Sequence, residues 1–440
     1  MAHSSTDYDL AILGGSLSSR LAACTAAQKG ARVILIAPNW RVVDATQCLL
    51  EALYSSCDTT DPLPWPTLCD WVHYRCEHPL VSPAVLRSQG IDVILDSASF
   101  TQKLDVKLTN RYLKASRYLL TDGYGTSTFN MAQSSLLCHQ LVQLGSIPER
   151  IGVMGKGASA VEWAYALSRV VKVKLVLLDQ QLLPAEDWDI QRLSEAQLRS
   201  LGIEVVFLKD YSGVGVTQIE PRQLNVDMLV TVSQPYDWGT LGLKKIGLPT
   251  STPVTVNRYL QTRCSQVYAS GGSLGGENRP ELTQQETTIA LRNALFGKWY
   301  SMYYEQVFYT IRLLSPIGRW GLTERQAKGR YGYGVEIFQA SCLPERAENI
   351  AETNFCKLIT LGQQLLGVHL MGDGAPTLIA ALGSCPNIQT LSQWATAGFQ
   401  PATLHDAIYQ AVKQWRSNRW SEGQWRRDLA ENWFNWRRSL

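Results

Sequence analysis

Apolar positions in the first 180 residues form two similar patterns, each a short apolar run, a turn of small residues, a helical repeat and a second apolar run. In the first pattern the runs are Leu10–Leu13 and Val33–Ile36, with a helix from about Ser18 to Lys29 between them. The second pattern covers residues 150–179. A strand, a crossover helix and a second strand form a βαβ unit, so each pattern predicts part of a parallel sheet.

The turn of the second unit has the residue types of a dinucleotide fingerprint, G-x-G-x-x-A, formed by Gly155, Gly157 and Ala160. The first glycine permits a tight turn, the second lets the backbone approach a pyrophosphate, and the alanine keeps helix and strand close. Asp179 ends the following strand, where a carboxylate can accept hydrogen bonds from a ribose. This unit therefore predicts a dinucleotide-binding fold and favours NAD over NADP.

The turn of the first unit has lost part of this pattern. It begins with Gly14 and Gly15, but serines occupy two of the three fingerprint positions, and Ala37 stands where a ribose-binding acid is expected. We expect the same βαβ fold here, with weaker contacts to a nucleotide.

The remaining chain reads as smaller elements. Residues 42–54 predict a helix, and residues 91–120 alternate like a small antiparallel sheet. A helix is expected from about Thr283 to Phe296. After residue 300, strand-like segments followed by helices indicate an α+β domain. The predicted strands there are Gln306–Leu313, Tyr333–Gln339, Cys356–Thr360 and Leu365–Met371.

Composition narrows the class of protein. A chain of 440 residues with 45% hydrophobic and 18% charged residues is typical of a globular protein with two or three domains. A net charge of +3 gives no reason to expect a nucleic-acid partner. Ten cysteines without a C-x-x-C pair favour reduced thiols and no metal site. No apolar run is long enough to span a membrane, so we expect a cytoplasmic protein, peripheral to a membrane or a large complex if it is attached to either.

Through several motifs and their order along the chain, the sequence resembles the pyridine nucleotide–disulfide oxidoreductases, which include glutathione reductase, dihydrolipoamide dehydrogenase and mercuric reductase. The motifs are the two glycine turns about 140 residues apart, VYASGG at 267–272, GLTERQA at 321–327 and KLITLGQQLLGVHLMGDGA at 357–375. The resemblance implies an FAD-binding homodimer that passes hydride from NAD(P)H through the flavin to a disulfide. It places Gly271 in the second flavin segment and Glu162 where a family glutamate reaches toward the flavin.

The resemblance also implies a domain order of two Rossmann-like domains and a C-terminal α+β dimerisation domain. The predicted parts are a flavin-type domain at 1–145, a nicotinamide-type domain at 146–262, a return segment of the flavin-type domain at 263–302, the dimerisation domain at 303–412 and a tail at 413–440.

The chain departs from the family where the family's chemistry lies. A C-x-x-x-x-C pair is expected after the first βαβ unit, yet Cys48 stands there and the next cysteine is Cys57. The family's H-P-T-x-x-E becomes Pro401 to Asp406, with His405 displaced, so no catalytic residue is assigned. The aspartate after Gly271 is Gly272. From these losses we expect FAD binding to be doubtful, while NAD(H) binding remains open.

The tail predicts an amphipathic helix. At a hundred degrees per residue Trp425, Leu429, Trp433 and Trp436 share an arc of about 80°, whereas Arg426 and Arg437 lie outside it. Three interpretations remain open. The apolar stripe packs on the chain's own domain, docks on a protein partner, as tryptophan and arginine favour, or binds the surface of a membrane.

The sequence favours a catalytically degenerate member of the family. In this hypothesis the protein is a homodimeric scaffold or regulatory protein that binds its partner through the tail. The alternative is an NAD(P)H-dependent FAD oxidoreductase that passes electrons to a quinone, a metal or another small acceptor. A weaker third hypothesis is a sensor in which NAD(H) changes the affinity for a partner.

Overall fold

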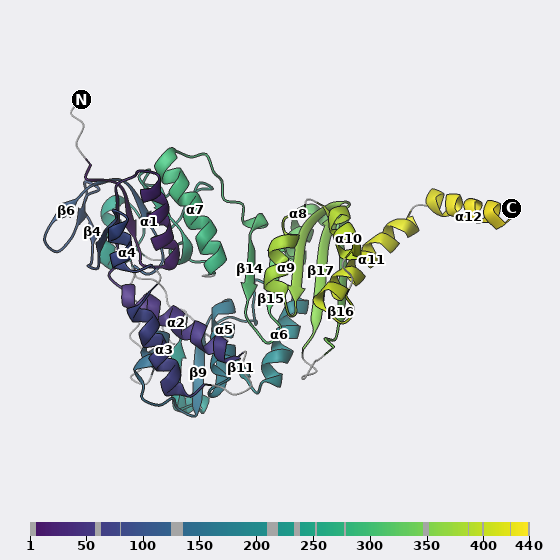
Figure 1. Cartoon of the computed structure of the whole chain (residues 1–440), viewed down its shortest axis with the longest axis horizontal. Helices are drawn as coiled ribbons and strands as arrows, with labels where there is room; N and C mark the ends of the chain where they lie inside the picture. The colour runs from purple at the N-terminus through teal and green to yellow at the C-terminus, as the bar shows by residue number, and fades with distance from the viewer. Residues whose placement is uncertain are drawn as a thin grey trace. The chain divides into compact units, whose positions relative to one another are not determined.

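The computed structural model describes residues 6–57, 63–79, 81–124, 135–208, 219–232, 238–250, 253–276, 279–345, 352–385, 387–397, 400–422 and 424–438. The chain divides into two compact units (Figure 1). The first comprises Met1–Pro184 and Leu201–Tyr303, and the second comprises Ala185–Ser200 and Tyr304–Leu440.

A parallel sheet of five strands forms one half of the first unit, in the order β13-β7-β1-β2-β3. Strand β1 lies at its centre and is buried from Leu10 to Leu13, as its unbroken apolar run predicts. Helices α1 and α7 contact each other, and α7 also packs on β1, β7 and β13. The bounds are β1 Tyr8–Leu13, α1 Leu17–Gln28, β2 Val33–Ile36, β3 Asp92–Ile94, β7 Ala115–Leu120, β13 Val267–Ala269 and α7 Pro280–Phe296.

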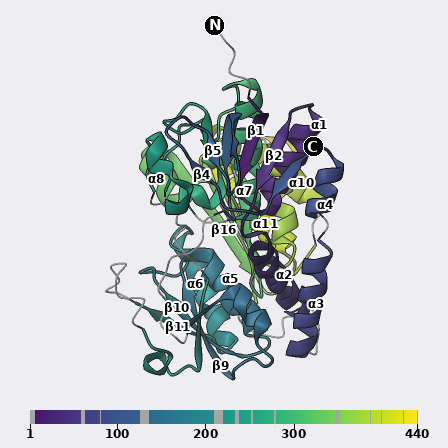
Figure 2. The same cartoon turned by 90° about the vertical axis from the view of Figure 1, so that its left-hand side faces the viewer.

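Two long helices follow the first βαβ unit and lie against each other (Figure 2). They are α2, Trp40–Cys57, and α3, Trp65–Glu77, followed by the short α4, Pro83–Ser88. The prediction of one antiparallel sheet over residues 91–120 is wrong in part, because β3 and β7 join the parallel sheet. Within residues 91–120, only β4 (Ser99–Phe100), β5 (Val106–Lys107) and β6 (Tyr112–Leu113) form an antiparallel sheet.

A second parallel sheet, in the order β11-β10-β9-β12-β8, forms the other half of the first unit. Helix α5 packs on β9 and β10, and its small residues Ala158, Ala160 and Ala164 are buried. The bounds are β8 Ser135–Leu137, β9 Arg150–Gly155, α5 Gly157–Leu167, β10 Lys172–Leu177, β11 Glu204–Phe207 and β12 Met228–Thr231.

The second unit is built on an antiparallel sheet in the order β14-β15-β18-β17-β16. Helix α11 packs on β16 and β17 and closes the core. The bounds are α6 Trp188–Ser200, β14 Phe308–Ile311, β15 Ile317–Gly321, α8 Glu324–Tyr331, β16 Val335–Cys342, β17 Asn354–Leu361, β18 Gln364–Met371, α9 Ala375–Leu382, α10 Ile388–Ala397, α11 Leu404–Glu422 and α12 Gln424–Arg438.

Short 3-10 helices complete the described elements: η1 Cys138–Gln143, η3 Pro221–Leu224, η4 Gly239–Leu241, η5 Leu243–Ile246, η6 Gly271–Leu274, η7 Tyr304–Gln306 and η8 Gly332–Gly334. Among the described helices, none combines the length and apolar character that crossing a membrane requires. The prediction of two Rossmann-like domains and a C-terminal α+β domain is confirmed.

Candidate dinucleotide-binding sites

The first glycine turn is closed by a chain of hydroxyl groups. Gly14 has a φ of +151°, and a Cβ there would come within 2.0 Å of Thr121 Oγ1, so only glycine fits. Ser16 has a φ of −64° and caps α1, a conformation open to any L-residue. Its hydroxyl lies 2.7 Å from that of Ser19, which lies 2.6 Å from Thr121 Oγ1. The two serines are therefore compatible with the turn.

A buried arginine joins this turn to helix α2. Arg20 donates through Nε to the carbonyl of Gly15 at 2.9 Å and through Nη2 to Asp44 at 2.6 Å. The guanidinium carbon lies 3.5 Å from the centre of the Trp40 ring. Burial lowers the pKa of Arg20 and raises that of Asp44, although each opposes the shift of the other. The pair fixes the start of α2 against the glycine turn.

Asp122, which follows β7, connects both halves of the candidate flavin site. Its backbone carbonyl accepts hydrogen bonds from the N–H groups of Gly15 at 3.0 Å and Ser16 at 3.2 Å. Its carboxylate accepts from the N–H of Gly272. The carboxylate also fills the space beside Gly271, where a Cβ would come within 2.3 Å of Oδ2. One residue therefore holds the turn after β1 and the turn after β13.

The sequence has no aspartate after Gly271, but the structure places a carboxylate at this turn. This carboxylate comes from the neighbouring strand, since β7 and β13 pair in parallel and end at the same edge. Glu286 of α7 adds a second carboxylate, which accepts from the N–H of Gly271 at 2.6 Å. Burial, with the nearby Glu286 charge, raises the pKa of Asp122 to about 7. Sequence reasoning missed Asp122 and Glu286.

The second glycine turn has the predicted geometry. Gly157 begins α5 with a φ of +57°, and its N–H donates to the Asp179 carboxylate at 2.7 Å. Asp179 therefore lies at the helix start, where Rossmann folds bind a pyrophosphate and ribose. Gly155 ends β9, and Ala160 is fully buried in α5. These four residues lie together, as the sequence predicts.

Glu162 lies on the same helix and forms a buried ion pair. Its carboxylate accepts from Arg279 Nη1 at 2.8 Å, and the side chains are 13% and 2% exposed. Arg279 precedes α7, so the pair joins the second glycine unit to the return segment of the first sheet. Because breaking a buried pair leaves an uncompensated charge, Glu162 has a structural role here, and its position toward the flavin stays a prediction.

Cys48 has a thiol neighbour that its spacing in the sequence does not reveal. The thiols of Cys48 on α2 and Cys76 on α3 are close enough to affect each other's pKa. Burial, together with the neighbouring thiol and carboxylates, raises the pKa of Cys48 to about 12, and burial raises that of Cys76. Both thiols are therefore protonated at neutral pH and are weak nucleophiles. Cys57, the next cysteine in sequence, ends α2.

His405 packs as an ordinary side chain at the start of α11. Its ring centre lies 4.8 Å from that of Trp394, and burial lowers its pKa. The neighbouring Asp406 accepts from the N–H of Ala402 at 3.3 Å, which closes the turn before the helix.

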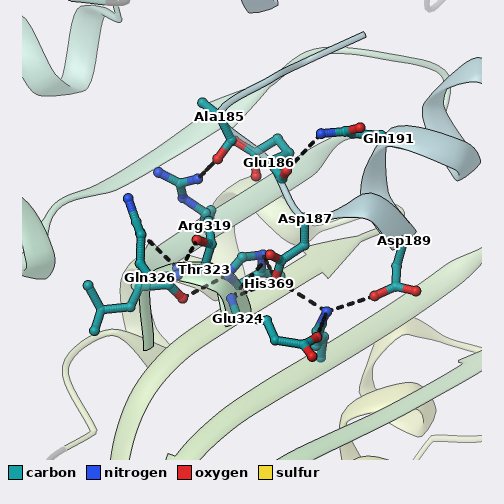
Figure 3. Close-up of polar contacts among 12 residues, drawn as sticks. Ala185, Glu186, Asp187, Asp189, Gln191, Arg319, Thr323, Glu324, Gln326 and His369 are labelled. Carbon is teal, nitrogen blue, oxygen red and sulfur yellow. Dashed lines mark hydrogen bonds and ion pairs between the residues drawn. The ribbon is translucent and has the colours of Figure 1, made fainter. Parts of the chain in front are cut away.

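The second unit contains a buried cluster of charges, part of which Figure 3 shows. Lys357 of β17 is 2% exposed, and its Nζ lies 3.2 Å from Asp187, 2.7 Å from Asp189 and 2.7 Å from Glu324. Hydrogen bonds to Asp189 and Glu324 raise the pKa of Lys357, although burial alone would lower it. Asp187 also accepts from the N–H of Glu324 at the start of α8. One cation thus joins the starts of α6 and α8 to the sheet.

His369 of β18 lies beside this cluster and is fully buried. Its Nε2 donates to the carbonyl of Leu322 at 3.1 Å, and its Nδ1 lies 3.7 Å from Asp187. Burial lowers the pKa of His369 to about 4, so the ring is neutral at physiological pH. Glu186 accepts from Tyr309 and from Arg319 at 3.3 Å, and Arg319 donates to the carbonyl of Ala185 at 2.5 Å.

The C-terminal tail forms two helices. Helix α11 buries Trp415 in the core, whereas Leu429, Trp433 and Trp436 on α12 are exposed. Arg437 is exposed too, and the side chains of Trp425 and Arg426 lie outside the described residues. More than half of the surface of Leu429, Trp433 and Trp436 is therefore open to solvent.

The turns fit the two nucleotides to different degrees. The start of α1 offers small residues and backbone N–H groups that suit a pyrophosphate, but Ala37 supplies no ribose acid. At the Gly271 turn, the N–H groups of Gly271 and Gly272 already donate to Glu286 and Asp122. The start of α5 with Asp179 has both features. Within the described residues, no group of three or more His, Cys, Asp or Glu side chains is placed to hold a metal ion.

Comparison with known proteins also identifies dinucleotide-binding oxidoreductases as relatives of this chain. Residues 8–288 match the family model described as pyridine nucleotide-disulphide oxidoreductase. A dihydrolipoyl dehydrogenase of Bacillus subtilis is 24% identical, with 92% of this chain and 98% of that protein aligned. A mercuric reductase of Staphylococcus aureus is 23% identical over 68% of this chain and 58% of that protein.

Solved structures have the same fold. LpdA from Mycobacterium tuberculosis superimposes with a TM-score of 0.72 at 17% identity, covering 92% of this chain and 99% of that one. The HOCl-induced flavoprotein disulfide reductase RclA from Escherichia coli, solved as a Cu(II) complex, has a TM-score of 0.70 at 18% identity, covering 91% and 98%.

The family match corrects the expectation for cofactors. It runs through both glycine turns and the return segment, and the family's members are FAD-binding flavoproteins that use NAD(P)H. The expectation that FAD binding is doubtful is therefore wrong. With residues 8–288 matched and both nucleotide-binding sheets in place, the chain belongs to the pyridine nucleotide-disulphide oxidoreductase family.

Proposed function

We propose that the protein is an NADH-dependent flavoprotein oxidoreductase that passes electrons to a quinone, a metal or another small acceptor instead of a disulfide. The observation that carries this proposal is the second glycine turn, where Asp179 accepts from the N–H of Gly157 at the start of α5. The absence of a C-x-x-x-x-C pair after the first unit argues for an acceptor other than a disulfide.

In this proposal the start of α5 holds the NADH pyrophosphate and Asp179 accepts hydrogen bonds from the ribose hydroxyls. The start of α1 binds the FAD pyrophosphate, and the turn at Gly271, held by Asp122, lines the same site. Bound FAD would supply the two-electron chemistry that takes up hydride from NADH. The pair of Glu162 and Arg279 positions α5 against the segment before α7. The family's homodimeric state is proposed for this chain as well.

The experiment is a flavin spectrum of the purified full chain, followed by NADH oxidation with three classes of acceptor. We expect bound FAD and turnover with a quinone or ferricyanide, but none with glutathione disulfide or oxidised lipoamide. Turnover with a disulfide would contradict the proposal. A flavoprotein that oxidises NADH with none of these acceptors would instead support the catalytically degenerate scaffold, which stays a prediction.

A substitution at Asp179 tests which nucleotide is used. Changing Asp179→Ala removes a charged hydrogen-bond acceptor, so the KM for NADH should rise roughly tenfold to a hundredfold, while discrimination against NADPH should shrink because no carboxylate repels its 2′-phosphate. Steady-state kinetics with both nucleotides measure this. The control is Glu204→Ala, a carboxylate on β11 that is 64% exposed. An equal rise in the KM for NADH and for NADPH would mean that Asp179 only maintains the turn.

A further inference from the structure

Helix α12 exposes large apolar side chains of the kind that α11 buries. On α11, Leu404, Ile408 and Trp415 are at most 6% exposed and belong to the core of the second unit. On α12, which contacts α11 and ends the described chain (Figure 1), four large side chains are more than half exposed. They are Leu429 at 58%, Trp433 at 56%, Phe434 at 51% and Trp436 at 54%.

The described side chains of α12 divide into two sides. With 3.6 residues per turn, one side of roughly 200° contains every described aromatic, aliphatic and basic side chain. Its members are Leu429, Ala430, Trp433, Phe434, Trp436, Arg437 and Arg438. The opposite side contains only acids and amides, which are Asp428, Glu431, Asn432 and Asn435. Arg437 therefore lies between Trp433 and Phe434, whereas Arg438 lies at the edge of the opposite side, beside Glu431.

This distribution of side chains fits the headgroup layer of an anionic bilayer. Tryptophan and phenylalanine favour the boundary between lipid headgroups and acyl chains, and adjacent arginines are attracted to anionic headgroups. A helix that lay in such a layer would bury its aromatic side and keep Asp428 and Glu431 in water. A helix that packed its aromatic side on a second copy of itself would bring Arg437 of the two chains toward one shared interface without an acid on the same side.

We propose that α12 docks this chain on a bilayer that contains anionic lipid, lying in the headgroup layer with Trp433 and Trp436 toward the acyl chains. The proposal does not depend on NADH oxidation, because its residues belong to the second unit and none contributes to the glycine turns. A protein partner and a second copy of the chain are the competing occupants.

The test is cosedimentation of the full chain with vesicles of phosphatidylcholine alone or with phosphatidylglycerol added. We expect binding to the anionic vesicles, little to the neutral ones, and release at high salt. The double variant Trp433→Ala/Trp436→Ala should bind at least about tenfold more weakly. Changing Arg437→Gln should weaken binding roughly fivefold.

The matched control is Asn435→Ala, a neutral change on the opposite side, which should bind like the wild type. Vesicle binding that is absent, independent of phosphatidylglycerol, or equally lost in the control would overturn the proposal. The molar mass of each variant is measured by light scattering. A tryptophan variant that loses mass together with vesicle binding would assign the face to a second copy and also overturn it. Unchanged NADH oxidation by these variants keeps this test separate from that of the enzyme.

Discussion

Replacing Lys357 with methionine is expected to lower the free energy of unfolding of the second unit by about 3–5 kcal/mol. The substitution keeps the apolar volume but leaves Asp187, Asp189 and Glu324 without their shared buried cation. Thermal unfolding and urea titration of the full chain measure the loss. The start of α6 should also become accessible to proteases, because Lys357 is the cation that joins it to β17.

The matched control shares one of the same carboxylates. Lys328 pairs with Glu324 across one turn of α8 at 2.5 Å, but Lys328 is 54% exposed, so Lys328→Met should cost less than about 1 kcal/mol. Equal losses for the two variants would show that burial of the cation is unimportant.

The pH dependence of the stability difference gives a second test of the role of Lys357. Burial tends to raise the pKa of Glu324, but hydrogen bonds from Lys328 and Lys357 outweigh it and lower that pKa. A lowered carboxylate pKa gives stability above the unfolded pKa that is lost as pH falls. The difference between wild type and Lys357→Met should therefore narrow in acid, where the carboxylates are protonated. A difference that is independent of pH would contradict the electrostatic explanation.

Changing Asp122 to asparagine is expected to stabilise the first unit at neutral and alkaline pH. Burial raises the pKa of Asp122 to about 7, whereas an unfolded aspartate titrates near pKa ~3.9. A raised carboxylate pKa means that the folded state holds the proton more tightly, so wild-type stability should fall as pH rises from about 4 to about 7. A shift of about three units corresponds to at most about 4 kcal/mol.

Asparagine can still accept from the N–H of Gly272, and it removes the charge beside Glu286, so Asp122→Asn should lack this decline. Thermal midpoints across pH 4 to 8 measure it, with the exposed Asp70→Asn on α3 as the control. Parallel pH profiles for wild type and Asp122→Asn would show that Asp122 does not titrate in this range. The flavin content of the variant tests separately whether the charge contributes to cofactor binding.

The architecture could be predicted because it depends on local patterns. Unbroken apolar runs at β1, β2, β9 and β10, each beside a small-residue turn, are enough to identify the two parallel sheets. Helix α3 escaped prediction because Trp65–Glu77 mixes proline, histidine and cysteine and has a weak apolar period. Strand β15 escaped because IGRWG reads as a turn. Gly318 is required there, since a Cβ would come within 2.8 Å of the Ala375 carbonyl of α9.

The details of the flavin site could not be predicted because they depend on pairs of residues far apart in the sequence. The carboxylate at the turn after β13 belongs to Asp122, 150 positions before Gly272, and the parallel pairing of β7 with β13 brings the two turns together. In the same way, Cys48 and Cys76 become neighbours through the packing of α2 on α3. Had the pairing of β7 with β13 been inferred from the motifs, it would have drawn attention to an acid at the end of β7.

The chain passes between its two units three times, after Pro184, after Ser200 and after Tyr303. A fragment that begins at Tyr304 would therefore lack α6, and Lys357 would lose Asp187 and Asp189 at once. Such a fragment should be poorly folded even though it contains all five strands of its sheet. The second unit is therefore built from two separate stretches of sequence. A fragment that represents it must contain residues 185–200 as well as the C-terminal part, for example joined by a short linker.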